Sequence, residues 1–213
     1  MTQKERAAFC VEQLKIKYPD AICSLEAADP FQLLVATRLS AQCTDARVNL
    51  VTPALFAAYP TPAQMAKASY EQVEKYIKSC GLYKTKAKSL VDMAVMLCNE
   101  FGGQVPDSLE NLVKLPGIGR KTANLIMGDI YKQPGSVVAD THLIRITNRI
   151  GLVASKDPYR VEMDLRKILP PDESSDFCHR IVHFGREVCS ARAPKCENCP
   201  LVTHCKKIGV TTK

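Results

Sequence analysis

Leu115-Pro116-Gly117-Ile118-Gly119-Arg120-Lys121-Thr122-Ala123 is the stretch that decides how this sequence is interpreted. It predicts a hairpin of two helices over about 107–130, in which both glycines permit the positive φ of a tight turn. Ile118 between the glycines can point into the core and hold the turn in place. Backbone N–H groups of the turn and the N-terminus of the second helix would then bind a phosphate without reading a base. An ordinary connection between two helices explains the same residues equally well.

Residues typical of helix starts and helix ends recur along the rest of the chain. Thr2 and Ser69 each open a capping box, and Asp29 stands before a proline at the first helical position. Gly102 follows an apolar stripe of helical spacing. The one extended run, 136–139, is too short for a sheet. We therefore expect an all-α protein, with helices over about 2–18, from 30, from 44, and over 69–80, 85–101, 107–115, 120–130, 141–150, 158–169 and 174–188.

Length and composition suit one large globular domain or two small ones. The 213 residues are 46% apolar and 24% charged, which is enough to bury a sizeable core. No apolar run is long enough to span a membrane, and the first residues lack the apolar core of a signal peptide. We therefore expect a cytoplasmic protein, associated with the nucleoid if it is bacterial.

Positive charge is concentrated in three segments. The net charge is +7, and segment 75–88 holds five lysines and no acidic residue. Segments 114–132 and 189–213 carry net charges of +3 and +4, so the rest of the chain is acidic. This distribution indicates a polyanionic partner, nucleic acid first of all, although solvated helix faces produce the same pattern.

Four of the ten cysteines are crowded near the C-terminus in the spacing C-x6-C-x2-C-x5-C: Cys189, Cys196, Cys199 and Cys205. Four thiolates this close in sequence can converge on a tetrahedral zinc ion or on an iron–sulfur cluster. The spacing does not choose between them, and His204 also permits a Cys3His zinc site. The other six cysteines lie in apolar helical patterns, where buried free thiols are expected.

Lys121 and Asp140 are the residues best suited to catalysis. Lys121 falls in the first turn of a helix beside Arg120, where the helix dipole and the second cation favour a neutral amine able to form a Schiff base. Asp140 follows the extended run and can stabilise an oxocarbenium-like sugar as a base departs. The plainer interpretations are a phosphate-binding lysine and a helix-capping aspartate.

Five motifs, taken in order, resemble the endonuclease III family of helix-hairpin-helix DNA glycosylases, which excise oxidised pyrimidines and cleave abasic sites. They span nearly the whole chain: Leu39-Ser-Ala-Gln-Cys-Thr-Asp45, Gly81-Leu82-Tyr83, the 115–123 string, Val138-Ala-Asp-Thr-His142 and the four terminal cysteines. Cys43 departs from the pattern, which most often has a small residue such as alanine there. Several spaced motifs that agree are far more specific than any one of them.

The resemblance assigns a role to each motif. Lys121 would be the Schiff-base nucleophile, Asp140 would assist departure of the base, and the four terminal cysteines would hold a [4Fe–4S] cluster. Because C1′ must be reached within a duplex, the damaged nucleotide would be flipped out. Gln42 would then fill the vacated space, and Leu82 would wedge the opposite strand, unless it simply packs in the core. Further DNA contacts are expected from Gly117, Gly119, Arg120, Thr141, His142, Arg192 and Lys195.

The resemblance also implies two helical domains with the active site in the cleft between them. One domain, 23–133, would carry the hairpin, and the other, 1–22 joined to 134–213, would carry the cluster loop 189–205. We expect a monomer that acts on duplex DNA containing damaged pyrimidines or abasic sites. The alternatives are a pyrimidine-dimer or mismatch glycosylase of the same superfamily, a non-catalytic DNA-binding module, and a zinc-dependent DNA-binding protein. The adenine-mismatch branch generally has a small hydroxyl residue in place of Lys121.

Overall fold

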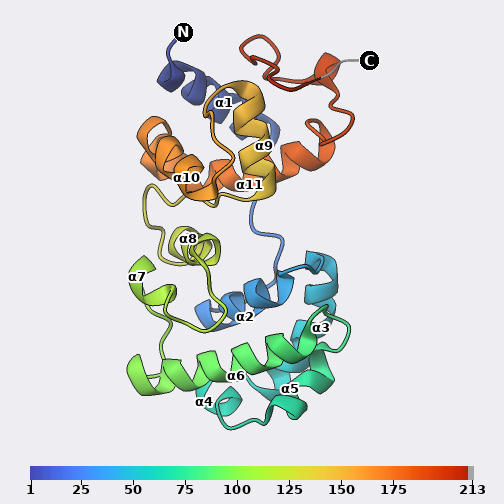
Figure 1. Ribbon diagram of the computed structural model, residues 1–213, viewed down its shortest axis with the longest axis vertical. Coiled ribbons are helices and arrows are strands. Elements are labelled where there is room, and N and C mark those ends of the chain that lie inside the picture. Colours follow the sequence, from blue (N-terminus) through green and yellow to red (C-terminus); the bar gives the residue numbers. More distant parts are fainter. Residues whose placement is uncertain (211–213) are drawn as a thin grey trace. The chain divides into compact units, whose positions relative to one another are not determined.

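The computed structural model of the protein describes residues 1–210, and within that range it consists of helices and loops with no β-strand (Figure 1). The all-α expectation is therefore confirmed. Residues 23–131 form one compact unit, and residues 1–22 together with those from 132 onward form a second. Within residues 1–210, no helix combines the length and apolar character needed to cross a membrane.

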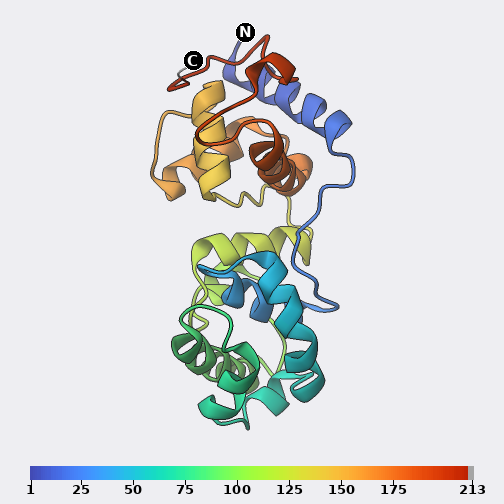
Figure 2. The ribbon, with the colours of Figure 1, turned by 90° about the vertical axis from the view of Figure 1, so that its right-hand side faces the viewer.

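The 23–131 unit surrounds one deeply buried helix (Figure 2). Its helices are α2 Pro30–Ser40, α3 Asp45–Ala58, α4 Pro62–Met65, α5 Tyr70–Ile77, α6 Tyr83–Glu100, α7 Leu109–Leu112 and α8 Arg120–Asp129. Asp29 caps α2 by accepting a hydrogen bond from the Gln32 N–H, and Pro30 begins it. Seven of the eleven residues of α2 are buried. This helix therefore forms the centre against which α3, α6 and α8 pack.

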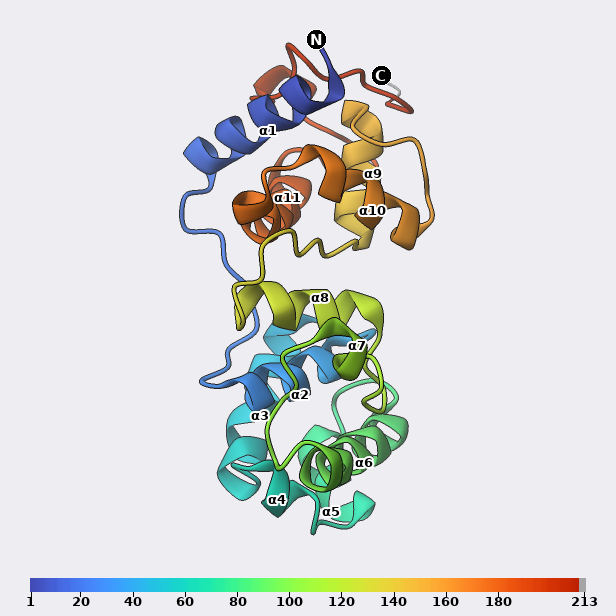
Figure 3. The same cartoon turned by 90° about the vertical axis from the view of Figure 1, so that its left-hand side faces the viewer.

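The second unit joins the two ends of the chain (Figure 3). It contains α1 Gln3–Lys17, α9 Thr141–Ile150, α10 Pro158–Ile168, the 3-10 turn η1 Pro171–Glu173, α11 Ser174–Glu187 and the 3-10 turn η2 Cys196–Asn198. Helix α1 lies against α11 and α10. The Tyr18 hydroxyl donates to the Glu187 carboxylate over 2.8 Å, and Lys15 pairs with Glu173. Residues far apart in sequence therefore form one core.

Local capping signals place most helix starts correctly. The capping boxes at Thr2 and Ser69 are both present, and the Thr44 hydroxyl caps α3. Two expectations needed correction. Helix α6 begins at Tyr83 rather than near 85, because Leu82 at its N-cap has no capping side chain and gives no local signal. Helix α7 covers only 109–112 of the expected 107–115, because the Ser108 hydroxyl caps the chain there.

Candidate active site and cysteine pocket

The turn of the hairpin is built around Gly117. Its φ is +79°, and a Cβ added there would lie 2.3 Å from Nε of Arg38, so neither the backbone nor the space admits a side chain. Arg38 is held in that place because its Nε donates to the Ser89 hydroxyl over 3.0 Å. Ile118 is 5% exposed, which confirms that it points into the core.

Gly119, unlike Gly117, does not use the positive φ that a glycine permits. It is the N-cap of α8, with an extended backbone at φ −96° and ψ 172°, and nothing lies within 4 Å of an added Cβ. No side chain caps α8, so Gly119 leaves the first N–H groups of the helix open to a ligand. An exposed helix N-terminus of this kind suits a phosphate oxygen.

Lys121 is the second residue of α8 and is exposed, while Arg120 beside it is half-buried. The ammonium of Lys121 acts on the Cys23 thiol. The pKa of the Cys23 thiol is raised to about 11, chiefly by burial and in part by the Asp129 and Asp45 carboxylates, while a backbone hydrogen bond at Leu25 and the Lys121 ammonium oppose the rise. The hairpin therefore presents an exposed amine at the start of α8.

Asp140 is the N-cap of α9, which confirms the prediction that this aspartate caps a helix. Its Oδ1 accepts a hydrogen bond from the Leu143 N–H over 2.7 Å. The residue is half-buried, and the bond to Leu143 engages Oδ1 of its carboxylate. Thr141 next to it is exposed. His142 is half-buried, with its Nδ1 3.3 Å from Nη2 of Arg145.

Gln42 and Leu82 lie on two adjoining loops of the 23–131 unit. Both are exposed, and both have positive φ, +54° for Gln42 and +57° for Leu82. A Cβ added to Gly81 would be 3.5 Å from the carbonyl oxygen of Gln42, so the two loops touch through their backbones. Left-handed backbone at a non-glycine residue is strained, and an exposed, strained leucine has no role in packing the core. The core interpretation of Leu82 is therefore wrong.

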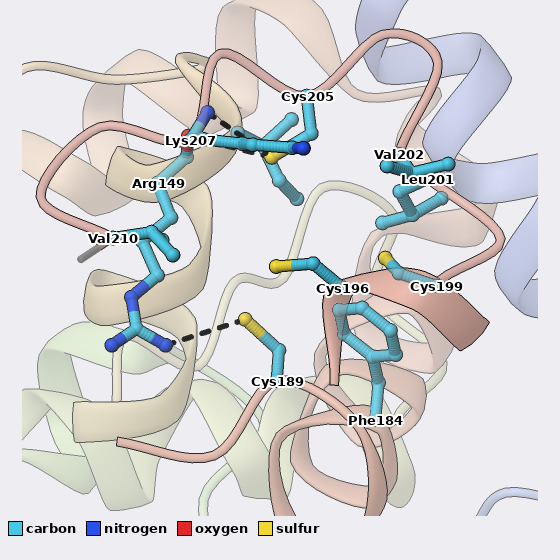
Figure 4. Close-up of a pocket in the computed structure, with 11 residues that line it drawn as sticks. Arg149, Phe184, Cys189, Cys196, Cys199, Leu201, Val202, Cys205, Lys207 and Val210 are labelled. Carbon is cyan, nitrogen blue, oxygen red and sulfur yellow. Dashed lines mark hydrogen bonds between the residues drawn. The ribbon is translucent and has the colours of Figure 1, made fainter. Parts of the chain in front are cut away.

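Cys189, Cys196, Cys199 and Cys205 line one pocket of about 350 Å³, part of it open to solvent (Figure 4). The four thiols interact electrostatically: the pKa of Cys199 is raised to about 11, chiefly by burial and in part by the other three cysteines. Within residues 1–210, no three ligand side chains converge closely enough to hold a single ion. The four sulfurs instead border a shared space.

Hydrogen bonds to sulfur surround this pocket. Nη1 of Arg149 donates to Sγ of Cys189 over 3.5 Å, and the Lys207 N–H donates to Sγ of Cys205 over 3.4 Å. Such donors stabilise thiolates. His204 is exposed, packs edge-to-face on Phe9 with 4.5 Å between ring centroids, and does not line the pocket. The Cys3His alternative therefore has no geometric support.

The loop after Cys189 carries Arg192 and Lys195, which are both exposed. Arg149 on α9 holds this loop: Nη1 donates to the Ser190 carbonyl and Nη2 to the Ala191 carbonyl, each over 2.7 Å. Because the clamp is buried and bidentate, the two exposed cations are presented from a fixed backbone.

Comparisons with known proteins show which family this chain belongs to. Residues 35–171 match the family model described as "HhH-GPD superfamily base excision DNA repair protein". Endonuclease III of Synechocystis sp. is 43% identical over 96% of this chain and 93% of its own. Endonuclease III of Bacillus subtilis is 39% identical over 97% and 94%. The chain belongs to the endonuclease III family.

A solved structure of an endonuclease III trapped as a covalent intermediate with DNA, in an estranged-adenine complex, has the same fold. Its TM-score is 0.90 at 40% identity, over 97% of both chains. Membership of the endonuclease III family confirms the resemblance that the spaced motifs indicated. It leaves the roles of individual side chains as predictions.

The sequence patterns did not predict the roles of two buried cations. Arg149 clamps the cysteine loop, and Lys86 is fully buried. Both lie on apolar stripes of their helices: Arg149 follows Ile146 by three residues, and Lys86 precedes Leu90 by four. A cation on a buried stripe is the signal that could have found them, since a buried charge needs a partner.

Proposed function

We propose that this protein is a base-excision repair enzyme that removes oxidised pyrimidines from duplex DNA and then cuts the strand 3′ to the abasic site. One observation carries the proposal. The chain matches, over 97% of its length, an endonuclease III that has been trapped covalently on DNA, and it has an exposed Lys121 at the uncapped start of α8.

Lys121 is the proposed nucleophile. Its neutral Nζ attacks C1′ of the damaged nucleotide, and the electrons of the glycosidic bond leave with the base, which takes up a proton. Opening of the sugar then yields an imine between Nζ and C1′. Loss of a C2′ proton breaks the C3′–O bond by β-elimination, and water hydrolyses the imine to release Lys121. Exposure of the amine suits a substrate as large as a flipped nucleotide.

Asp140 is the proposed electrostatic partner of this reaction. Its Oδ1 is tied to the start of α9, which fixes the direction of the carboxylate. Oδ2 stabilises the positive charge that develops on the sugar as the base leaves.

DNA binding is proposed to divide between phosphate contacts and insertion into the duplex. Gly117 and Gly119 let the hairpin backbone approach a phosphate, and Arg120 adds charge. Gln42 fills the space of the flipped nucleotide, and Leu82 wedges the opposite strand. Additional contacts on the other unit are proposed for Thr141, His142, Arg192 and Lys195.

The cysteine pocket is proposed to hold a [4Fe–4S] cluster. The four sulfurs border one pocket, which suits either a zinc ion or an iron–sulfur cluster, and membership of the endonuclease III family favours the cluster. When bound, the cluster supplies a rigid covalent tie that fixes the loop carrying Arg192 and Lys195 for phosphate contact. Metal analysis and visible absorbance distinguish iron and sulfide from zinc. We propose a cytoplasmic location, in association with the nucleoid if the source is bacterial.

Borohydride trapping on a duplex with one thymine glycol tests the function. The wild type should yield a covalent protein–DNA adduct, because borohydride reduces the imine. Lys121→Ala should yield none. Lys114→Ala is the matched control, since Lys114 is another exposed lysine of the same hairpin, and it should trap normally.

Each other outcome has a definite meaning. Trapping on a plain abasic site alone would keep the lyase and reject the proposed lesion class. An adduct that persists in Lys121→Ala would reject Lys121 as the nucleophile. Failure on both substrates with intact DNA binding would leave a non-catalytic binding module.

A further inference from the structure

Lys86 is hydrogen-bonded to both segments that carry the residues proposed for insertion into DNA. Its side chain is 0% exposed, and its Nζ donates to the Leu39 carbonyl over 2.7 Å. Its backbone N–H donates to the Leu82 carbonyl over 3.0 Å. One residue in the first turn of α6 therefore joins Leu82 to the last turn of α2, three residues before Gln42.

The bond to Leu39 replaces one that α2 gives up where it ends. A continued helix would direct the Cys43 N–H at this carbonyl, because helical amides donate to the residue four positions earlier. The Cys43 N–H instead donates to the Ser40 carbonyl over 3.0 Å, which closes a tight turn. The Lys86 amine takes the place of the missing amide, so the end of α2 depends on a side chain from α6.

The turn that follows is unfavourable for glutamine. Ala41 has φ −57° and ψ 113°, and Gln42 has φ +54°, which are close to the angles of a type II turn. Such a turn favours glycine at its third position, where Gln42 stands. Leu82, at φ +57° on the N-cap of α6, is strained in the same way. Strained backbone persists only where its surroundings impose it, and Lys86 provides one hydrogen bond beside each of these residues.

We propose that Lys86 is a positioning residue for damage recognition, one that holds Gln42 and Leu82 at a fixed spacing so that both enter the duplex together. Its role rests on the insertion functions proposed above for those two residues. The loops approach closely, since a Cβ added to Gly81 would be 3.5 Å from the Gln42 carbonyl oxygen. Loss of the Lys86 amine would free the end of α2, and Gln42 would lose its fixed distance from Leu82.

Ser89, one turn further along α6, provides the matched control. Its hydroxyl accepts a hydrogen bond from Nε of Arg38 over 3.0 Å, so it also joins α6 to α2. The Arg38 side chain lies against the hairpin turn, where it occupies the space beside Gly117. Ser89→Ala therefore weakens the packing of the same two helices, while the bonds at Gln42 and Leu82 remain.

Anisotropy with the full-length protein tests the role on two duplexes, one undamaged and one with a tetrahydrofuran abasic analogue. Lys86→Met should bind the abasic duplex about tenfold more weakly and the undamaged duplex as the wild type does. Ser89→Ala should keep the wild-type ratio of the two affinities, and circular dichroism checks that both variants are folded. A wild-type ratio in Lys86→Met, or an equal loss in Ser89→Ala, would overturn the proposal.

A 2-aminopurine base opposite the abasic analogue reports insertion directly. Its fluorescence rises when it leaves the base stack, so the wild type should raise it and Lys86→Met should not. Lys86→Gln should recover part of the rise, because glutamine has the length of methionine and keeps an N–H donor. Identical fluorescence in the two variants would overturn the role of the hydrogen bond. If Lys86→Met does not fold, Lys86→Gln takes its place beside Ser89→Ala, and a wild-type ratio of affinities would again overturn the proposal.

Borohydride trapping on a single-stranded abasic oligonucleotide separates positioning from chemistry. A single strand requires no insertion, so Lys86→Met should trap there at the wild-type rate and more slowly on the duplex. Equal losses on both substrates would show a general defect of the fold and overturn the proposal. Wild-type protein that does not prefer the abasic duplex would instead reject the proposed roles of Gln42 and Leu82.

Discussion

Nζ of Lys86 donates a hydrogen bond to the carbonyl of Leu39 over 2.7 Å, and the Lys86 side chain is wholly inaccessible to solvent. Leu39 is in the last turn of α2, where carbonyls lack partners within the helix. The bond therefore completes the end of α2 and ties it to α6, directly before the loop that carries Gln42. Burial lowers the pKa of Lys86, since the charged form loses its water.

Lys86→Met is expected to destabilise the fold by about 1–3 kcal/mol, because it leaves the buried Leu39 carbonyl without a donor. Lys88→Met is the control: Lys88 lies on the same helix, is exposed and pairs with Asp92, so its loss should cost about 0.5 kcal/mol or less. Urea unfolding of the two variants measures the difference. Equal midpoints would show that the buried hydrogen bond contributes nothing.

Gly117→Ala and Gly119→Ala should behave in opposite ways. At Gly117 the new Cβ meets Arg38 and the backbone is left-handed, so we expect a loss of about 1–3 kcal/mol in unfolding free energy. At Gly119 the backbone is ordinary and the space is open, so stability should change by about 0.5 kcal/mol or less. If Gly119 serves phosphate approach, its variant should fold normally and bind duplex DNA more weakly. Thermal melts measure the stability of the two variants, and anisotropy measures their affinity for duplex DNA. Similar melting temperatures for Gly117→Ala and Gly119→Ala would contradict the predicted difference in stability.

Asp140→Asn separates capping from catalysis. Asparagine caps a helix as well as aspartate does, so unfolding free energy should change by only a few tenths of a kcal/mol. Glycosylase turnover should fall about 100-fold or more, because the amide cannot stabilise a cationic sugar. Asp140→Ala should lose the same activity and about 1 kcal/mol of stability besides. An active asparagine variant would restrict Asp140 to capping.

Leu82→Ala should leave stability within about 0.5 kcal/mol, because the side chain is 60% exposed. Its affinity for an abasic duplex should nevertheless fall, through loss of the wedge. Leu50→Ala, at a leucine that is 70% exposed on α3, should change neither quantity. Leu82→Gly should add up to about 1 kcal/mol of stability by relieving the left-handed backbone. Equal DNA affinity in Leu82→Ala and Leu50→Ala would remove Leu82 from the interface.

The Cys23 thiol predicts an alkaline loss of stability. Burial raises its pKa from 9.0 to about 11, so as the pH rises through this interval the unfolded chain gives up the proton first. The unfolded state then binds fewer protons than the folded state, and stability falls. Cys23→Ala should therefore show a shallower decline in urea midpoint over that interval, measured against wild type in the same buffers. Parallel curves would contradict the assignment.

Sequence patterns predicted the elements whose signals are local. Four helix starts are predicted correctly because a side chain caps a backbone N–H group three residues further along the chain: Thr2, Asp29, Thr44 and Ser69. The start of α6 gives no such signal, because the Leu82 side chain at its N-cap caps no backbone group. The spacing of the four terminal cysteines predicts a metal site. It could not show that Arg149, forty positions before Cys189, would clamp their loop.

The sequence by itself determined the all-helical class, the hairpin, the cysteine set and the family, since all of these depend on spacing along the chain. Tertiary structure alone decided which glycine is indispensable, because the atom that excludes a side chain at Gly117 belongs to Arg38. It alone buried Lys86 and placed its Nζ on the Leu39 carbonyl. The physical reason is that burial and contact depend on which helices pack together, and helical periodicity does not carry that information.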